Sequence, residues 1–81
     1  MRTIKLYSRP GCHLCQDALN LLQVLQTEFS FEIKEINIDE SDELTEKYGL
    51  EIPVIEDGDQ VVVSGIIDVW TLSEYLSKTN L

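Results

Sequence analysis

Two cysteines separated by two residues are the part of this sequence best suited to chemistry. Cys12 and Cys15 are the only cysteines of the 81-residue chain, and His13 is its only histidine. A disulfide between neighbours this close closes almost no loop, so it would stabilise the fold little. A zinc site needs four ligands, and only His13 is available to help. Thiol–disulfide chemistry is therefore the favoured interpretation, with two inert buried cysteines or a metal or iron–sulfur site as alternatives.

A strand, a turn and a helix are expected to position this pair. Alternating apolar and polar residues predict a strand across residues 3–8, and Pro10-Gly11 predicts a turn after it. From Cys12 to about Glu28, apolar residues recur at helical spacing and predict an amphipathic helix. The cysteines therefore fall at the start of that helix.

This placement assigns different roles to the two sulfurs. At a helix N-terminus, unpaired backbone N–H groups and the helix dipole stabilise an anion such as a thiolate, which is the nucleophilic form of cysteine. Cys15 lies within the first turn, so its sulfur can reach that of Cys12. We expect Cys12 to attack and Cys15 to resolve.

The rest of the pattern completes a β-α-β-α-β-β-α order. A second strand is predicted over residues 31–38. Its alternation changes phase between Ile33 and Ile36, which indicates a bulge or a strand confined to the later half. A short helix ending at Gly49 and a hairpin turning at residues 56–59 follow. Asp68 is expected to cap a last helix. Its inward-facing residues are predicted to be Val69, Leu72, Tyr75 and Leu76, and Trp70 is also assigned to the core.

These elements predict one α/β domain spanning residues 1–81. The first βαβ unit requires a parallel strand pair with a right-handed crossover, and the later hairpin must be antiparallel. We therefore expect a four-stranded mixed sheet with helices on both faces.

The charge distribution limits the partners of the chain. Its net charge is −9, and residues 28–81 carry fourteen acids against three lysines. An acidic surface repels nucleic-acid phosphates and anionic membranes. The longest uncharged apolar run is residues 61–63, too short for a membrane span, and the N-terminal segment lacks the apolar stretch of a secretory signal. We expect a soluble cytoplasmic protein that binds proteins or small molecules at its less acidic N-terminal end, and neither nucleic acid nor membrane.

The segment from Tyr7 to Cys15, Tyr-Ser-Arg-Pro-Gly-Cys-His-Leu-Cys, resembles the active-site segment of glutaredoxins. Ile52-Pro53-Val54 resembles their cis-proline segment, and Ser64-Gly65 takes the place of their glycine pair. The chain is identified as a member of the small glutaredoxin-like group of the thioredoxin fold. Thioredoxin itself differs, with a tryptophan before the first cysteine and Gly-Pro between the two.

The resemblance implies a substrate site around the cysteines. Arg9 matches a basic residue that helps to hold the thiolate and a glutathione carboxylate, although a solvated turn arginine is the alternative. Pro53 would follow a cis peptide bond, so that the backbone of Ile52 pairs with the main chain of a substrate. Ser64-Gly65 would lie beside that segment, and Asp68 would hold the amino group of glutathione.

His13 is a candidate for tuning the pKa of the cysteine pair. A protonated imidazole there would stabilise the Cys12 thiolate and favour the reduced form, which makes the protein more oxidising. An exposed histidine with little effect is the alternative.

The resemblance implies a thiol–disulfide oxidoreductase that reduces protein or glutathione mixed disulfides. We expect a monomer with no bound cofactor or metal and with glutathione as co-substrate. The usual proline after the first cysteine is absent, and Ile67 replaces the acid expected before Asp68. Ser64-Gly65 is similar to redoxins that thioredoxin reductase reduces, which gives an alternative donor. A non-catalytic iron–sulfur carrier, bridged between two chains through Cys12, is the third hypothesis.

Overall fold

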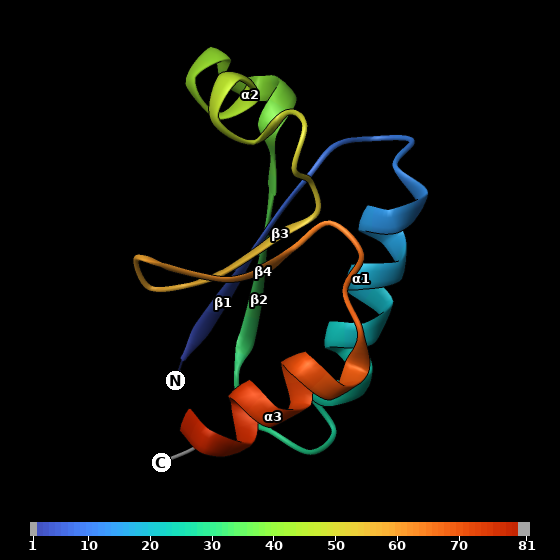
Figure 1. The fold of residues 1–81 in the computed structure, drawn as a ribbon, viewed down its shortest axis with the longest axis vertical. Coiled ribbons are helices and arrows are strands. Elements are labelled where there is room, and N and C mark those ends of the chain that lie inside the picture. Colours follow the sequence, from blue (N-terminus) through green and yellow to red (C-terminus); the bar gives the residue numbers. More distant parts are fainter. Residues whose placement is uncertain (1, 80–81) are drawn as a thin grey trace.

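The computed structural model describes residues 2–79, and its elements follow the predicted β-α-β-α-β-β-α order (Figure 1). The strands are β1 (Thr3–Ser8), β2 (Glu32–Asn37), β3 (Val54–Asp57) and β4 (Gln60–Ser64). The helices are α1 (His13–Leu25), α2 (Asp42–Tyr48) and α3 (Val69–Thr79), with a short 3₁₀ helix, η1 (Ile38–Glu40), before α2.

The four strands form one mixed sheet in the order β2-β1-β3-β4. β1 pairs with β2 in parallel and with β3 antiparallel, and β3 pairs antiparallel with β4. Because α1 connects two parallel neighbours, the carboxyl ends of β1 and β2 lie at the same edge of the sheet. The turn that leads to Cys12 begins at that edge.

The sequence offered two explanations for the change of phase in β2, a bulge or a strand confined to the later half, and both are wrong. β2 pairs with β1 residue for residue, from Thr3 opposite Glu32 to Ser8 opposite Asn37. The change of phase has another cause: Ile33 packs on the core beneath α1 and α3, whereas Ile36 packs on the core beside α2. Each residue is apolar because its own side of the sheet is covered there. The register shift of this sheet lies instead between β3 and β4, at Ile55 and Glu56.

Helices cover both faces of the sheet, as predicted. The larger core lies between the sheet, α1 and α3, and its fully buried members include Leu6, Leu22 and Leu72. A smaller core contains Tyr7, Ile38, Tyr48 and Val54, and it attaches η1 and α2 to the sheet. Figure 1 shows α2 and α3 at opposite ends of the molecule.

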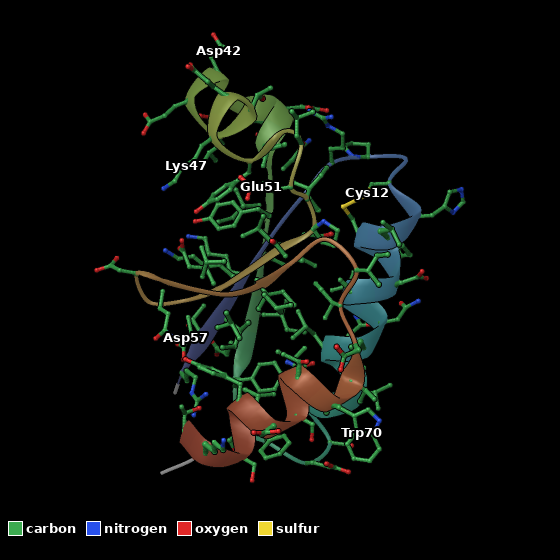
Figure 2. All side chains as sticks on the ribbon, viewed as in Figure 1. Cys12, Asp42, Lys47, Glu51, Asp57 and Trp70 are labelled. Carbon is green, nitrogen blue, oxygen red and sulfur yellow. A yellow bond between two sulfur atoms is a disulfide. The ribbon has the colours of Figure 1, made fainter. Side chains whose placement is uncertain are left out.

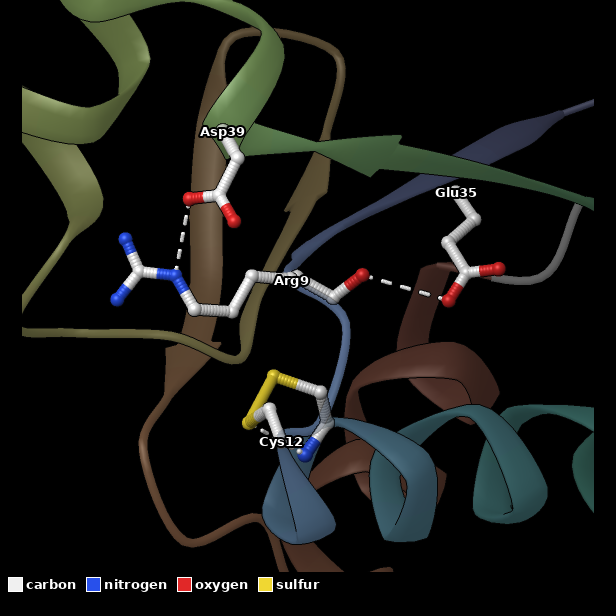
Figure 3. Close-up of a disulfide and its surroundings, with 6 residues drawn as sticks. Arg9, Cys12, Glu35 and Asp39 are labelled. Carbon is white, nitrogen blue, oxygen red and sulfur yellow. Dashed lines mark hydrogen bonds and ion pairs between the residues drawn. A yellow bond between two sulfur atoms is a disulfide. The ribbon is translucent and has the colours of Figure 1, made fainter.

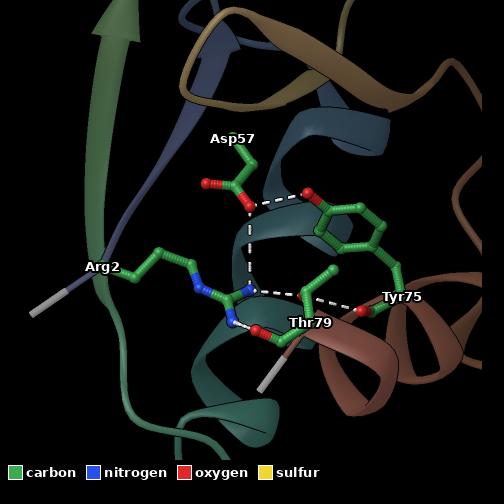
Figure 4. Close-up of polar contacts among 4 residues, drawn as sticks. All are labelled: Arg2, Asp57, Tyr75 and Thr79. Atoms are coloured by element: carbon green, nitrogen blue, oxygen red, sulfur yellow. Dashed lines mark hydrogen bonds and ion pairs between the residues drawn. The ribbon is translucent and has the colours of Figure 1, made fainter. Parts of the chain in front are cut away.

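Polar contacts attach the C-terminal half of α3 to the strands (Figure 4). The Tyr75 hydroxyl donates to Asp57 Oδ2 at 2.6 Å, and Arg2 forms an ion pair with the same carboxylate at 3.7 Å. Arg2 also donates to the side chain and the carbonyl of Thr79. This half of α3 is therefore held on the sheet by hydrogen bonds to charged side chains and by apolar contacts.

The start of α3 does not pack as predicted. Leu72 and Leu76 are buried and Tyr75 is half-buried, but Val69 is 44% exposed and Trp70 is 81% exposed. Trp70 lies on the side of the helix away from Leu72 and Leu76, because consecutive residues are about 100° apart around a helix. The assignment of Trp70 to the core is wrong, and so is that of Val69.

α1 ends at Leu25 rather than near Glu28. The N–H groups of Thr27 and Glu28 donate to Val24 and Leu25, three residues back, which closes the chain into tighter turns. The Thr27 hydroxyl also donates to the Val24 carbonyl at 2.7 Å, in competition with helical hydrogen bonding.

Candidate active site

Residues 9–12 carry the chain from β1 into α1 and determine where the first sulfur lies. Gly11 has φ +79°, a left-handed conformation that glycine adopts without strain. Cys12 is the N-cap of α1 and has extended backbone angles, and its carbonyl accepts the Gln16 N–H at 3.1 Å. The predicted placement of Cys12 at the helix N-terminus is confirmed.

The Cys12 sulfur acts as the capping group of the helix. Its Sγ accepts the backbone N–H of Cys15 at 3.1 Å. The first turn of α1 contains no acidic side chain that would oppose a negative charge on this sulfur. In the reduced protein, the same N–H and the positive end of the helix dipole would stabilise a Cys12 thiolate.

Cys12 and Cys15 form a disulfide, with their Cα atoms 5.2 Å apart (Figure 3). Cys15 is 3% exposed, whereas Cys12 is only partly buried. A large substrate can therefore approach Cys12 but not Cys15. This difference in access is what a nucleophilic and a resolving cysteine require.

Arg9 is paired with an acid from another part of the chain. Its Nε donates to Asp39 Oδ1 at 3.1 Å, and both side chains are partly exposed (Figure 3). The guanidinium is thus directed toward η1, and its charge is partly neutralised there.

The cis-proline segment lies at the start of β3, and in Figure 2 the Cys12 sulfur points toward the loop that contains it. The peptide bond between Ile52 and Pro53 is cis. The Gly65 N–H donates to the Pro53 carbonyl at 2.9 Å, and Val54 pairs with Ser64 across the hairpin. The structure therefore brings Ile52, Pro53, Ser64 and Gly65 together.

Asp68 lies apart from this group. It caps α3, as predicted, by accepting the Thr71 N–H at 2.8 Å and the Thr71 hydroxyl at 2.9 Å. These hydrogen bonds hold the pKa of the Asp68 carboxyl below its ordinary value. α3 begins beside the half of α1 that is distant from Cys12 (Figure 1). The structure thus assigns the Asp68 carboxylate to helix capping and does not place it against the disulfide.

His13 is the first residue of α1, and its side chain is exposed. Within residues 2–79 its imidazole makes no hydrogen bond or ion pair. Leu14, the next residue, is 46% exposed and adds apolar surface beside the disulfide.

A cleft of about 330 Å³ opens on the disulfide, on the side of β2. One wall consists of the turn before α1, both cysteines and Gln16. The other wall contains Glu35, Asn37 and Glu40, which the sequence analysis did not identify. These residues lie far from Cys12 in the sequence, and the parallel pairing of β2 with β1 brings them alongside it. The sequence could have identified them from the predicted βαβ unit, because the carboxyl ends of two parallel strands lie at the same edge of a sheet.

The fold and this site together define the class of protein. β1 leads into a helix capped by the first cysteine of a CxxC disulfide, and a cis-proline segment lies at the start of β3, the antiparallel neighbour of β1. This is a thioredoxin fold with a cysteine pair placed for redox chemistry.

The chain belongs to the glutaredoxin-like family, because the model of the Glutaredoxin-like domain (DUF836) matches residues 3–77. None of the curated proteins compared with the chain matches it.

Solved structures agree with this assignment. Protein Ne2328 from Nitrosomonas europaea is 35% identical, with 93% of this chain and 91% of that chain covered and a TM-score of 0.81. Target protein XcR50 from X. campestris is 28% identical over 94% of this chain and 97% of that chain, with a TM-score of 0.77. A mutant thioredoxin from Halobacterium salinarum is 19% identical over 99% of this chain and 75% of that chain, and its TM-score of 0.70 shows the shared fold.

Two features are absent from residues 2–79. No helix in this range is both long and apolar enough to cross a bilayer. The same range holds no group of three or more His, Cys, Asp or Glu side chains that could bind a metal ion.

Proposed function

We propose that this protein is a thiol–disulfide oxidoreductase that reduces disulfides of other proteins through Cys12 and Cys15. The observation that supports this most directly is the position of the Cys12 sulfur. It caps α1, accepts the Cys15 N–H at 3.1 Å, and is bonded to a cysteine that is 3% exposed. The accessible sulfur is therefore the one best placed to exist as a thiolate, and the buried sulfur is within bonding distance of it.

The reaction proceeds in two exchanges that start from the reduced protein. The Cys12 thiolate attacks one sulfur of the substrate disulfide, forms a mixed disulfide, and releases the other substrate sulfur as a thiolate. The Cys15 thiol then loses its proton and attacks the Cys12 sulfur, which releases the second substrate thiolate and closes the Cys12–Cys15 bond. Two electrons pass from the protein to the substrate, and an external thiol or dithiol reductant reopens the protein disulfide.

Backbone groups of the cis-proline segment position the substrate in this proposal. The Ile52 N–H already donates to the Tyr48 carbonyl at 3.1 Å. The Ile52 carbonyl is therefore the group that we assign to the main chain of an extended substrate. Gly65, whose N–H bridges the carbonyls of Glu51 and Pro53, holds the segment in place.

The electron donor is either glutathione or thioredoxin reductase, and the two are separated by parallel NADPH-coupled assays. One assay supplies glutathione with its reductase, and the other supplies thioredoxin reductase. Arg9, the basic residue that the family resemblance assigns to glutathione, is paired with Asp39. This pairing favours thioredoxin reductase as the donor. We also propose that the protein acts as a cytoplasmic monomer, which fractionation and mass in solution would test.

Single substitutions of the two cysteines test the assigned roles. Cys12→Ser is expected to abolish disulfide reduction, because the nucleophile is lost. Cys15→Ser is expected to accumulate a mixed disulfide between Cys12 and the substrate, visible by intact mass, because no sulfur remains to resolve it. The Cys12→Ser/Cys15→Ser variant is the control for background exchange. Equal residual activity in the two single variants would contradict the mechanism.

A further inference from the structure

The cleft beside the disulfide has an acidic outer wall. Glu35 in the second half of β2 and Glu40 at the end of η1 both line it, and both are exposed to solvent. The buried Ser8 hydroxyl donates to Glu35 Oε2 at 3.3 Å and holds this carboxylate at the cleft (Figure 3). A substrate bound to Cys12 would thus lie next to two carboxylates.

No basic side chain of residues 2–79 forms an ion pair with either of these two acids. The three cations near the start of the chain form ion pairs elsewhere: Arg2 with Asp57, Lys5 with Glu56 and Arg9 with Asp39. Neither Glu35 nor Glu40 has a basic partner within 4.0 Å in the described part of the chain. The N-terminal end that the sequence suggested to be less acidic is therefore covered by acids from the second half.

The charges around the cleft sum to a negative value. Arg9 contributes one positive charge, and Glu35, Glu40 and the Arg9 partner Asp39 contribute three negative charges. Walls of low dielectric strengthen the field inside a cleft, so this charge acts on any group that enters it. A cation is attracted, and an anion such as glutathione, with two carboxylates and one ammonium group, is repelled.

We propose that Glu35 and Glu40 select polypeptide disulfides that carry a lysine or arginine beside the reactive cysteine. This inference rests on the proposed function, because it concerns the substrate that Cys12 attacks. The substrate sulfur approaches Cys12 at the N-terminus of α1, and the basic side chain enters the cleft toward Glu35 and Glu40. The same carboxylates disfavour oxidised glutathione.

Three matched peptide disulfides test the preference. Each is the homodimer of one short peptide with Arg, Ala or Glu on both sides of its cysteine, and oxidised glutathione is the fourth substrate. The measured quantity is the second-order rate constant for oxidation of the pre-reduced protein in a single turnover, which requires no external donor. Each rate constant is divided by that of the same disulfide with dithiothreitol, because flanking charges also change the intrinsic reactivity of a disulfide.

We expect the normalised rate constants to fall in the order Arg, Ala, Glu, with glutathione disulfide below the Ala peptide. An exposed ion pair changes an association constant by up to about fivefold, so the span from Arg to Glu should be about tenfold at low ionic strength. The span should shrink in 0.5 M salt, where the Debye length is only about 4–5 Å.

Paired charge-neutralising variants locate the effect. Glu35→Gln/Glu40→Gln keeps an acceptor for Ser8 and should reduce the span to about twofold. Glu28→Gln/Glu32→Gln makes the same change of charge at exposed positions toward the other end of α1 and β2, and it should keep most of the span. Equal normalised rates for all peptides, or an undiminished span in the cleft variant, would overturn the substrate preference while leaving the oxidoreductase intact. If no disulfide reacts faster with the wild type than with Cys12→Ser, the proposed function fails and the preference fails with it.

Discussion

Tyr7 connects the strand that leads to the cysteines with the elements that carry the cis-proline segment. Its hydroxyl donates to Glu56 Oε1 at 3.0 Å, and the Tyr48 hydroxyl donates to Glu56 Oε2 at 3.3 Å. The two tyrosine rings are 4.8 Å apart, and Lys5 lies 3.8 Å from the same carboxylate. The cluster thus joins β1, β3 and α2. Tyr7→Phe removes one hydroxyl from it and keeps the ring.

The structure predicts both the size and the pH dependence of the loss of stability in Tyr7→Phe. Tyr7 donates a buried hydrogen bond to a carboxylate, so Tyr7→Phe should lower the free energy of unfolding by about 1.5–3 kcal/mol at neutral pH. Burial, with the hydrogen bond to Glu56 and the charge of Glu56 adding to it, raises the pKa of Tyr7 to about 12 from its ordinary 10.0. The unfolded chain loses this proton near pH 10, whereas the folded protein keeps it until about pH 12. The folded state therefore binds more protons in this window, and the stabilisation is lost as the pH rises through it.

About half of this loss falls between pH 8 and pH 11. With one pKa unit equivalent to about 1.4 kcal/mol, the wild type should lose about 1.4 kcal/mol relative to Tyr7→Phe between pH 8 and pH 11. Urea unfolding of both proteins at pH 8, 10 and 11 gives the difference. Both should carry Cys12→Ser and Cys15→Ser, which removes hydroxide attack on the disulfide and the titration of the thiols.

Ionisable groups far from Tyr7 contribute equally in both proteins, so their effects cancel in the comparison. A difference in unfolding free energy that stays constant from pH 8 to pH 11 would refute the pKa of Tyr7. A difference near zero at pH 8 would refute the contribution of the hydrogen bond to Glu56.

Three further substitutions test other parts of the structure. Gly11→Ala should lower the free energy of unfolding by about 1–2 kcal/mol, because the φ of Gly11 is +79°, a left-handed value that strains alanine. An added Cβ would meet no atom within 4 Å, so the backbone strain is the whole effect. Chemical denaturation measures the loss, and an unchanged midpoint would contradict that backbone conformation. Asp68→Ala should lower the Tm at neutral pH with little effect on turnover. The folded state lowers the pKa of Asp68, so the capping carboxylate is lost as the pH falls through that lowered pKa. The difference in Tm between the variant and the wild type should therefore close in acid. A gap that persists in acid would exclude the carboxylate as its source. Trp70→Ser should change the free energy of unfolding by no more than about 0.5 kcal/mol, as expected for an exposed side chain, and a loss of several kcal/mol would return Trp70 to the core.

The sequence alone determined the part of the site that depends on near neighbours. A strand over residues 3–8, a turn at Gly11 and a helix capped by Cys12 follow from alternation, turn residues and helical spacing within about twenty residues. The short distance between the two cysteines follows as well, because residues three positions apart in the first turn of a helix lie close together. Local backbone geometry decides all of these features, and local sequence encodes it.

Strand pairing and the packing of α3 decided the rest. The parallel pairing of β1 and β2 brings Glu35, and Glu40 just after β2, beside a disulfide at least twenty residues away in the sequence. No local pattern marks those two acids among the fourteen in residues 28–81. Tryptophan is a residue type often found in cores, but the way α3 packs on the sheet leaves Trp70 exposed to solvent. Asp68 matches its family position in sequence, yet α3 begins away from Cys12. Contacts between distant segments set these positions, so only the tertiary structure shows which charges surround the reactive sulfur.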